Sequence, residues 1–328
     1  MNTGLKIAAF AAALAATFGT AYGAGAALDP VVADGGSASH GEHRSEKPGR
    51  ADPDGNKGHD DPGTPAAGGL QVTEGGYTLA LGTERVAEGK ESELRFAILD
   101  EAGRKLTSYR REHGKELHFI VASRDLTVYR HLHPARAADG TWSVRTTLPE
   151  AGGYRAFADF KPGVKGAEGV TLGADLAVTG TAAPASPPAP SRTAKTDGYE
   201  VTLGGELRPG KARELTLRVT KDGRPVRDLQ PYLGAYGHLV ALRSGDLAYL
   251  HVHPGGEPGD GSTKPGPEIS FTATAPSAGT YRLFLDFRHE GKVRTAAFTV
   301  RAGTTETAEA GEGDAAGGAG HDESGHVH

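Results

Sequence analysis

The chain has 328 residues and a formal net charge of -5, so it is long enough for two domains and has no basic excess. We therefore expect no nucleic-acid partner. It contains no cysteine and its only methionine is Met1, which excludes disulfides and leaves imidazole, carboxylate and backbone oxygen as the available metal ligands.

Residues 1–28 have a polar start with Lys6 followed by an Ala-rich apolar run. This pattern indicates export. Small residues at 21–23 and 24–26 suit a cleaved signal peptide, yet about twenty apolar residues are also long enough for an uncleaved membrane anchor. Both alternatives stay open, and in either case we expect the rest of the chain to be extracellular or at the cell surface.

Three segments lack the branched and aromatic residues that a core requires. They are residues 29–71, rich in Gly, Pro and charge, the Pro-rich residues 181–197, and residues 303–328. Such segments cannot bury enough apolar surface to offset the entropy lost on ordering. We predict a disordered tether, a linker and a disordered tail, which leaves two folded domains over residues 72–180 and 198–302.

The two expected domains repeat one pattern. YTLALG at 77–82 matches YEVTLG at 199–204, and GYRAFADF at 153–160 matches TYRLFLDF at 280–287. Each copy is a series of short alternating runs broken by turn pairs such as Asp139-Gly140, with no long helical period. We therefore predict an all-β chain of two tandem immunoglobulin-like antiparallel β-sandwich domains that arose by duplication.

The first copy contains ELHFIVASRDLTVYRHLHP at residues 116–134. If its turn is centred between Arg124 and Asp125, a hairpin places His118 opposite His131. Period-two alternation puts His133 on the same face, and Pro134 should end the strand because proline cannot donate to a ladder. Three imidazoles are then expected at the open end of one hairpin.

The second copy, GHLVALRSGDLAYLHVHP at residues 237–254, has the same spacing. With the turn centred on Ser244-Gly245, His238 faces His251, and His253 follows on the same face before Pro254. Neutral imidazole is the commonest metal ligand in proteins, and three histidines with a free fourth position suit zinc or copper(II).

Two aspartates complete the predicted sites. Asp159 and Asp286 interrupt the matching apolar runs, and each is predicted to be a fourth ligand or to accept the second ring N–H of a ligating histidine. We predict one metal site in each domain. The predicted ligand sets are His118, His131, His133 and Asp159 in the first domain, and His238, His251, His253 and Asp286 in the second.

The same histidines have an alternative interpretation. A buried histidine is usually a hydrogen-bonded core residue, and copies of one ancestor are not independent observations. The alternative function is a non-catalytic cell-surface interaction module with structural histidines. Enzyme activity is not expected, since the sequence has no G-x-S-x-G and no phosphate-binding loop. Tail histidines give a second, weaker metal signal: His40, His43, His59, His321, His326 and His328.

At LHFIVASRDLTVYRHLHP, DGTWSV and GGYRAFADF the chain resembles a group of actinobacterial exported proteins with an HxHP-containing β-sandwich domain. The resemblance implies an exported heavy-metal or copper-binding protein. The chain is also similar to small immunoglobulin-like copper-resistance proteins, although it lacks their methionine-rich ligands, which leaves copper(II) or zinc. We expect a role in metal buffering, delivery or resistance, with a membrane metal transporter or another cell-surface protein as partner.

Overall fold

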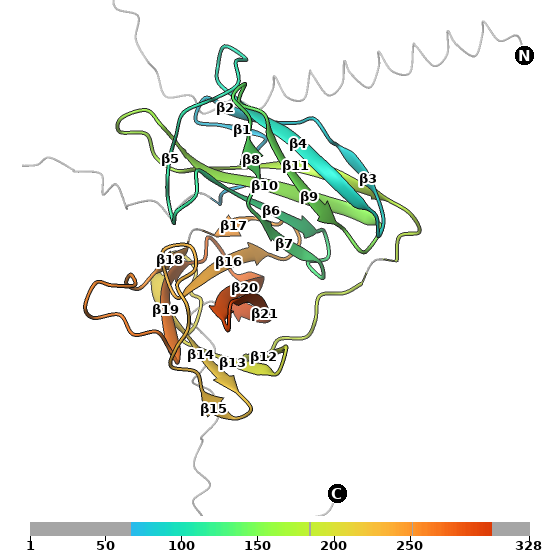
Figure 1. Ribbon diagram of the computed structural model, residues 1–328. Coiled ribbons are helices and arrows are strands. Elements are labelled where there is room, and N and C mark those ends of the chain that lie inside the picture. The colour runs from blue at the N-terminus through green and yellow to red at the C-terminus, as the bar shows by residue number, and fades with distance from the viewer. Residues whose placement is uncertain (1–66, 184, 251, 304–328) are drawn as a thin grey trace, which may run out of the picture. The chain divides into compact units, whose positions relative to one another are not determined.

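Alternating apolar residues form strands throughout the computed structural model, which describes residues 67–183, 185–250 and 252–303 (Figure 1). These residues contain no helix that could cross a membrane. The predicted signal or anchor segment, most of the predicted tether and nearly all of the predicted tail lie outside the described residues. The described residues fall within one compact unit, Asp60–His328.

The first repeat is a sandwich of two sheets (Figure 1). We call the sheet that carries His118 the inner sheet and its partner the outer sheet. The outer sheet has the order β1 (Thr73–Glu74), β2 (Tyr77–Leu81), β4 (Glu91–Leu99), β9 (Trp142–Thr147), β8 (Ala135–Arg136). The inner sheet has the order β3 (Arg85–Ala87), β11 (Val170–Thr179), β10 (Gly152–Pro162), β6 (Leu117–Ser123), β7 (Tyr129–Leu132), and β5 (Tyr109–Arg110) pairs with β10.

The second repeat has the same two-sheet arrangement, and its inner sheet is the one that carries His238. Its outer sheet has the order β12 (Thr193–Thr196), β13 (Tyr199–Gly204), β14 (Ala212–Lys221), β19 (Glu268–Thr274), β18 (Val252–Pro254), and β15 (Arg224–Pro225) pairs with β14. Its inner sheet has the order β17 (Tyr249–Leu250), β16 (Gly237–Arg243), β20 (Gly279–His289), β21 (Lys292–Ala302). The prediction of two tandem immunoglobulin-like β-sandwiches is confirmed.

A tyrosine in each repeat fixes the corner where the chain passes between sheets. The Tyr154 hydroxyl donates to the Glu150 carbonyl at 2.8 Å, and the Tyr281 hydroxyl donates to the Ser277 carbonyl at 2.7 Å. Both span four residues, as in the tyrosine corner of immunoglobulin-like folds. The matched Tyr-Arg runs of the two sequence copies therefore have the same structural role.

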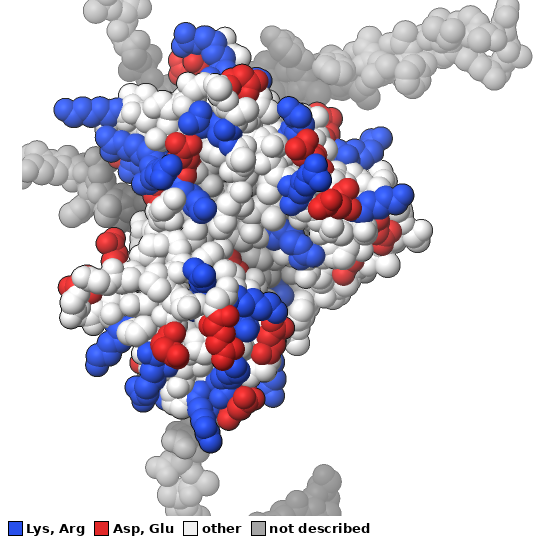
Figure 2. All heavy atoms as spheres, viewed as in Figure 1, with Lys and Arg blue, Asp and Glu red and all other residues white. Residues whose placement is uncertain are grey.

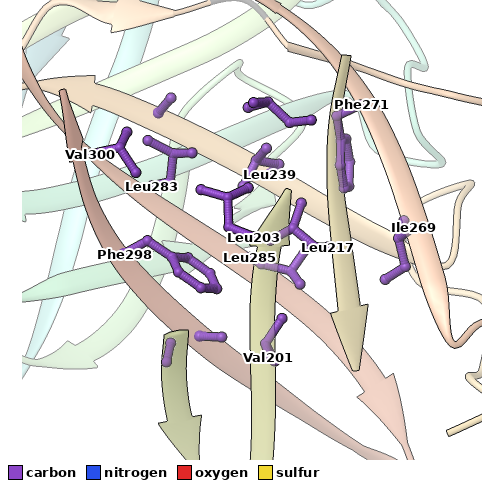
Figure 3. Packing of buried hydrophobic residues seen from close by; sticks show 14 of the residues in the cluster. Val201, Leu203, Leu217, Leu239, Ile269, Phe271, Leu283, Leu285, Phe298 and Val300 are labelled. Atoms are coloured by element: carbon purple, nitrogen blue, oxygen red, sulfur yellow. The ribbon is translucent and has the colours of Figure 1, made fainter. Parts of the chain in front are cut away.

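Each sandwich has its own core between its two sheets. In the first, Phe96 and Phe119 stack with ring centroids 4.2 Å apart, and Trp142 fills the same core. Figure 3 shows the second core, where Leu203 and Leu217 of the outer sheet meet Leu283 and other side chains of the inner sheet. Full burial of such a side chain stabilises the fold by about 1.5–3 kcal/mol.

A third apolar cluster joins the inner sheets of the two repeats. Tyr129 stacks on Phe284 with ring centroids 4.1 Å apart, and the matching pair from the opposite repeats, Tyr249 and Phe157, has centroids 5.8 Å apart. The other buried members are Ile120, Ala122, Leu126, Val240, Leu242 and Leu247. Strand β6 is consequently buried along its whole length, because it faces its own core on one side and the other repeat on the other.

Two of the predicted boundaries differ from the structure. Within the expected tether, Gly68 exchanges two backbone hydrogen bonds with Tyr249, at 3.1 and 2.9 Å, and Arg155 donates to the Gly69 and Leu70 carbonyls. Within the expected linker, β12 pairs with β13 and extends the second sandwich. Backbone pairing and one buried guanidinium order these segments, although they contribute few apolar side chains.

Both signs of charge are interspersed on the face shown in Figure 2. Many charges are paired, such as Arg218 with Glu268 at 2.9 Å across neighbouring strands and Arg124 with Asp175 at 2.7 Å. Such exposed pairs contribute little to stability. Because positive and negative side chains are interspersed, the face in view has no extended region of positive or negative charge.

Candidate metal centre

Three histidines from both sandwiches meet where the inner sheets face each other. They are His118 on β6, His131 on β7 and His238 on β16, and one ring nitrogen of each lies within 4.8 Å of the others. His118 Nδ1 is 3.1 Å from His131 Nε2, and the His118 and His238 rings stack with centroids 5.2 Å apart. We call these residues the histidine triad.

The hairpin register that we predicted is wrong by two residues. His131 lies opposite Ile120, not His118, because the turn is centred one residue later than expected. Leu126 adopts a left-handed φ of 59°, and the Ser123 N–H donates to the Val128 carbonyl at 3.0 Å, closing a four-residue loop. The loop length is still even, so His118 and His131 remain on one face as diagonal neighbours within reach of each other.

The second hairpin shows the same displacement, with Leu242 opposite Tyr249 and Ala241 opposite Leu250. Leu247 has the matching left-handed φ of 60°, and the Arg243 N–H donates to the Ala248 carbonyl at 2.9 Å. The shared error therefore comes from a loop conformation that the two repeats have in common.

The His-x-His-Pro motif is the point where the chain leaves the inner sheet for the outer one. β7 ends at Leu132 and the next strand, β8, belongs to the outer sheet, so Pro134 lies in the crossover. In the second repeat β18 already belongs to the outer sheet and ends at Pro254. We expected His131 and His133 to be successive same-face positions of one strand, but His133 lies beyond the end of β7.

This crossover separates the predicted ligands. His133 borders the triad, with its ring centroid 4.8 Å from that of His131, whereas His253 is exposed on β18 opposite Thr272. His251 lies outside the described residues and stays a predicted ligand. We expected one cluster in each domain, and the described residues form one cluster that both domains share.

Both predicted aspartates lie directly opposite a triad histidine: Asp159 faces His118 and Asp286 faces His238. Asp286 Oδ2 lies 2.8 Å from Nδ1 of His131, and both side chains are 3% exposed. With Nδ1–H donating to this carboxylate, Nε2 of His131 is the nitrogen left for the triad. Asp159 instead accepts from the Thr171 hydroxyl at 2.9 Å and lines the adjoining cavity.

Burial favours the neutral form of His118, His133 and His238. Loss of solvent, together with neighbouring His131, lowers the pKa of His118 to about 3 and that of His133 to about 4. Burial lowers the pKa of His238 well below its ordinary value. Neutral imidazole is the form that binds metal, so no proton has to be removed from these rings at neutral pH.

Two ring nitrogens are buried and have no hydrogen-bond partner within the described ranges. They are Nδ1 of His238 and Nε2 of His133. An unsatisfied buried polar group costs about 1–3 kcal/mol, so native structures rarely retain one without a reason. A bound cation would use a free ring lone pair at this position.

Two hairpin tips meet beside the triad. Glu112 and Lys115 close a two-residue turn over His113-Gly114, and the second repeat forms the same turn over Leu233-Gly234. A methyl group on Gly234 would lie 3.4 Å from the His113 Cα, so the tips are in contact. We did not predict His113 as a site residue. The His-Gly pair in the sequence could have predicted this turn, because it suits a turn with positive φ at both positions.

A cavity of about 340 Å³ adjoins the triad. His118 and His238 line it from the triad, and the exposed residues His113 and His253 line it as well. The cavity is also lined by acidic and by basic side chains. The acidic ones are Glu112, Glu116, Asp159 and Glu257, and the basic ones are Arg110, Lys115 and Lys161. The triad is therefore adjacent to a space that an ion can occupy.

The fold and the site define a protein of two immunoglobulin-like sandwiches that share a buried histidine cluster. The chain belongs to the family described as Domain of unknown function (DUF8832), which matches residues 71–171 and 194–304. No curated protein matches the chain.

Solved structures with some similarity include bacterial surface proteins. The Escherichia coli adhesin FdeC is 14% identical, covering 71% of this chain and 65% of that chain, with a TM-score of 0.22. Yersinia pseudotuberculosis InvD is 14% identical, covering 73% and 62%, with a TM-score of 0.21. A putative membrane anchored protein from Corynebacterium diphtheriae is 11% identical, covering 72% and 60%, with a TM-score of 0.20. The chain spans less than two thirds of the length of these structures, and we draw no functional inference from them.

Proposed function

We propose that this chain binds a divalent metal ion, zinc or copper(II), at the histidine triad, and that it does so outside the cytoplasm for metal buffering, delivery or resistance. The observation that supports this most directly is the convergence of three imidazoles whose ring nitrogens lie within 4.8 Å of one another. Nitrogen ligands around tetrahedral zinc are about 3.4 Å apart, so modest ring rotations are enough to enclose an ion.

The surroundings of the triad support the same proposal. The carboxylate of Asp286 orients the His131 ring from its far side, which is the usual arrangement behind a metal-binding histidine. His133 supplies a fourth candidate nitrogen at the border of the triad. The absence of sulfur from the candidate ligands favours zinc or copper(II) over copper(I).

Binding rather than catalysis is the proposed activity. A three-histidine site can activate water on zinc when a base is available nearby. Here Asp286, which contacts the triad, already accepts from His131 at 2.8 Å and from the Thr295 hydroxyl at 2.5 Å. This carboxylate is therefore engaged in orienting the histidine and is not free to accept a proton from water.

The alternative is a non-catalytic cell-surface interaction module with structural histidines. The buried bond between His131 and Asp286 favours it, because this bond links the two sandwiches without an ion. In both cases the proposed partner is a membrane metal transporter or another cell-surface protein, and we propose membrane attachment for the case in which the N-terminal segment is not cleaved.

Calorimetric titration with zinc and with copper(II) tests the proposal. The titrated protein is the full chain with alanine at the six tail histidines, so that the tails do not bind; we call it the tail-substituted chain. A shared site predicts one equivalent of metal, and His118→Ala or His238→Ala alone should remove it, although the two residues belong to different repeats. The positions substituted in the tails are His40, His43, His59, His321, His326 and His328.

The outcomes separate the hypotheses. Two equivalents, of which each single substitution removes one, would mean an independent site in each domain. No saturable binding, with the thermal midpoint unchanged by metal, would contradict metal binding and favour structural histidines. Asp228→Asn is the control, because Asp228 contacts His289 in the second sandwich at 3.0 Å and should leave the titration unchanged.

A further inference from the structure

We propose that the cavity beside the triad is the route by which the metal ion reaches it, with His113 and His253 acting as a loading site on that route. This inference rests on the proposed function, metal binding at the triad. The ligand is the same divalent cation, which two exposed imidazoles hold transiently before it passes to the buried ones.

The cavity connects histidines of both kinds. His118 and His238 belong to the triad and line the cavity, so an ion in the cavity is already next to two of the proposed final ligands. His113 and His253 line the same cavity and are exposed. The Nδ1 atom of His238 is buried without a hydrogen-bond partner among the described residues, which leaves it available to an arriving ion.

His113 is close enough to transfer an ion directly. Its ring centroid lies 6.1 Å from that of His118 and 6.2 Å from that of His238. With metal–nitrogen bonds of about 2 Å, an ion bound to His113 can reach a triad nitrogen after a small side-chain movement. The turn over His113-Gly114, with φ of 51° and 76°, holds this imidazole at the hairpin tip beside the triad.

Charge does not explain recruitment of the ion. Lys161 pairs with Glu112 at 3.1 Å, and Glu116 pairs with Arg136 at 3.2 Å, so much of the charge around the cavity is already neutralised. The imidazoles are then the groups that capture the cation. Association should accordingly depend weakly on salt, unlike capture by an acidic surface.

Stopped-flow mixing of zinc with the tail-substituted chain tests this route. The variant is His113→Asn/His253→Thr, because asparagine tolerates the left-handed φ at the turn and threonine suits an exposed strand position. A loading site on the entry route lowers the free-energy barrier both to binding of the ion and to its release. The variant should therefore slow association and chelator-induced dissociation equally, by about tenfold, while the equilibrium affinity stays within about twofold.

Each outcome decides the matter. Equal slowing of both rates supports the loading site, and Leu233→Asn, which changes the matching hairpin tip, should change neither rate. Unchanged rates in the variant would overturn the inference while metal binding at the triad stands. Weaker affinity with unchanged association would overturn it too, because His113 or His253 would then be a ligand in the bound state. If the tail-substituted chain binds no zinc, the proposed function fails and the inference fails with it.

Discussion

Nδ1 of His131 lies 2.8 Å from Oδ2 of Asp286, and the two residues belong to different sandwiches. The first repeat thus supplies the imidazole and the second repeat supplies the carboxylate that orients it. Because both side chains are almost fully buried, this bond contributes to holding the repeats together as well as to the geometry of the triad.

Asp286→Asn should weaken zinc binding about 10- to 100-fold, because the amide no longer fixes the His131 ring through a charged acceptor. It should also lower the free energy of unfolding by about 1–3 kcal/mol, since a buried charge-assisted bond is lost. Calorimetry and urea unfolding measure the two effects. Asp228→Asn removes a histidine–carboxylate pair whose Asp228 side chain is 83% exposed, and an equal effect there would contradict a special role for Asp286.

Tyr129→Phe should stabilise the chain by about 1 kcal/mol without changing zinc affinity. The Tyr129 hydroxyl is buried and has no hydrogen-bond partner among the described residues, so removing it relieves a desolvation cost. The comparison is Tyr154→Phe, where the lost bond to Glu150 should destabilise by about 1 kcal/mol. Urea unfolding of both variants checks the sign, and destabilisation by Tyr129→Phe would show that its hydroxyl has a partner.

Phe284→Ala should destabilise the chain by about 3–5 kcal/mol, the usual cost of such a cavity, and should weaken zinc binding. The reason is that Phe284 stacks on Tyr129 between the repeats that together form the triad. Phe298→Ala, within the second core alone, is the matched control. It should cost similar stability but leave the zinc affinity of the folded protein close to normal, and equal losses of affinity would contradict a shared site.

Without metal, the chain should lose stability as the pH falls below about 6.5. Burial lowers the pKa of His118 to about 3 and that of His133 to about 4, from an ordinary value of 6.5. Above 6.5 these rings are mostly neutral in both states, so their contribution is fully present. Below it the unfolded chain binds protons that the folded chain excludes, and stability falls by up to about 1.4 kcal/mol per pH unit for each such group.

Urea unfolding in chelator between about pH 7 and pH 4 measures this loss. His118→Gln should reduce the slope in that window, because one titrating group is removed. An identical slope in the variant would mean that His118 is protonated as readily in the folded as in the unfolded chain.

The sequence predicts the sandwiches well because alternation and turn pairs are local signals. It predicts that the histidines of a hairpin share one face of the sheet, because any loop with an even number of residues preserves that face. It does not predict the register, because the register depends on where Leu126 and Leu247 adopt left-handed conformations. The run LHFIVAS also carries more information than we used. A strand without polar alternation has two buried faces, which already indicates a neighbour beyond its own sandwich.

The shared triad was beyond sequence reasoning for a different reason. Spacing within one repeat can relate His118 to His131, but nothing local specifies that His238 of the other repeat lies beside them. Asp286 was predicted to be a fourth ligand or to orient a ligating histidine of its own domain, whereas the histidine it contacts is His131 of the other repeat. His113 and Thr295 were missed because their roles follow from a hairpin tip and from a neighbouring strand.

The pairing of Gly68 with Tyr249 has a consequence for the order of folding. Gly68 is among the first described residues to be synthesised, yet its two backbone hydrogen bonds go to a strand made about 180 residues later. The first repeat can assemble its own sheets early, but the pairing of Gly68 with Tyr249 cannot form until the second hairpin exists. Until then Tyr129 and Phe157 lack the partners that the second repeat provides, and the nascent chain exposes an apolar surface.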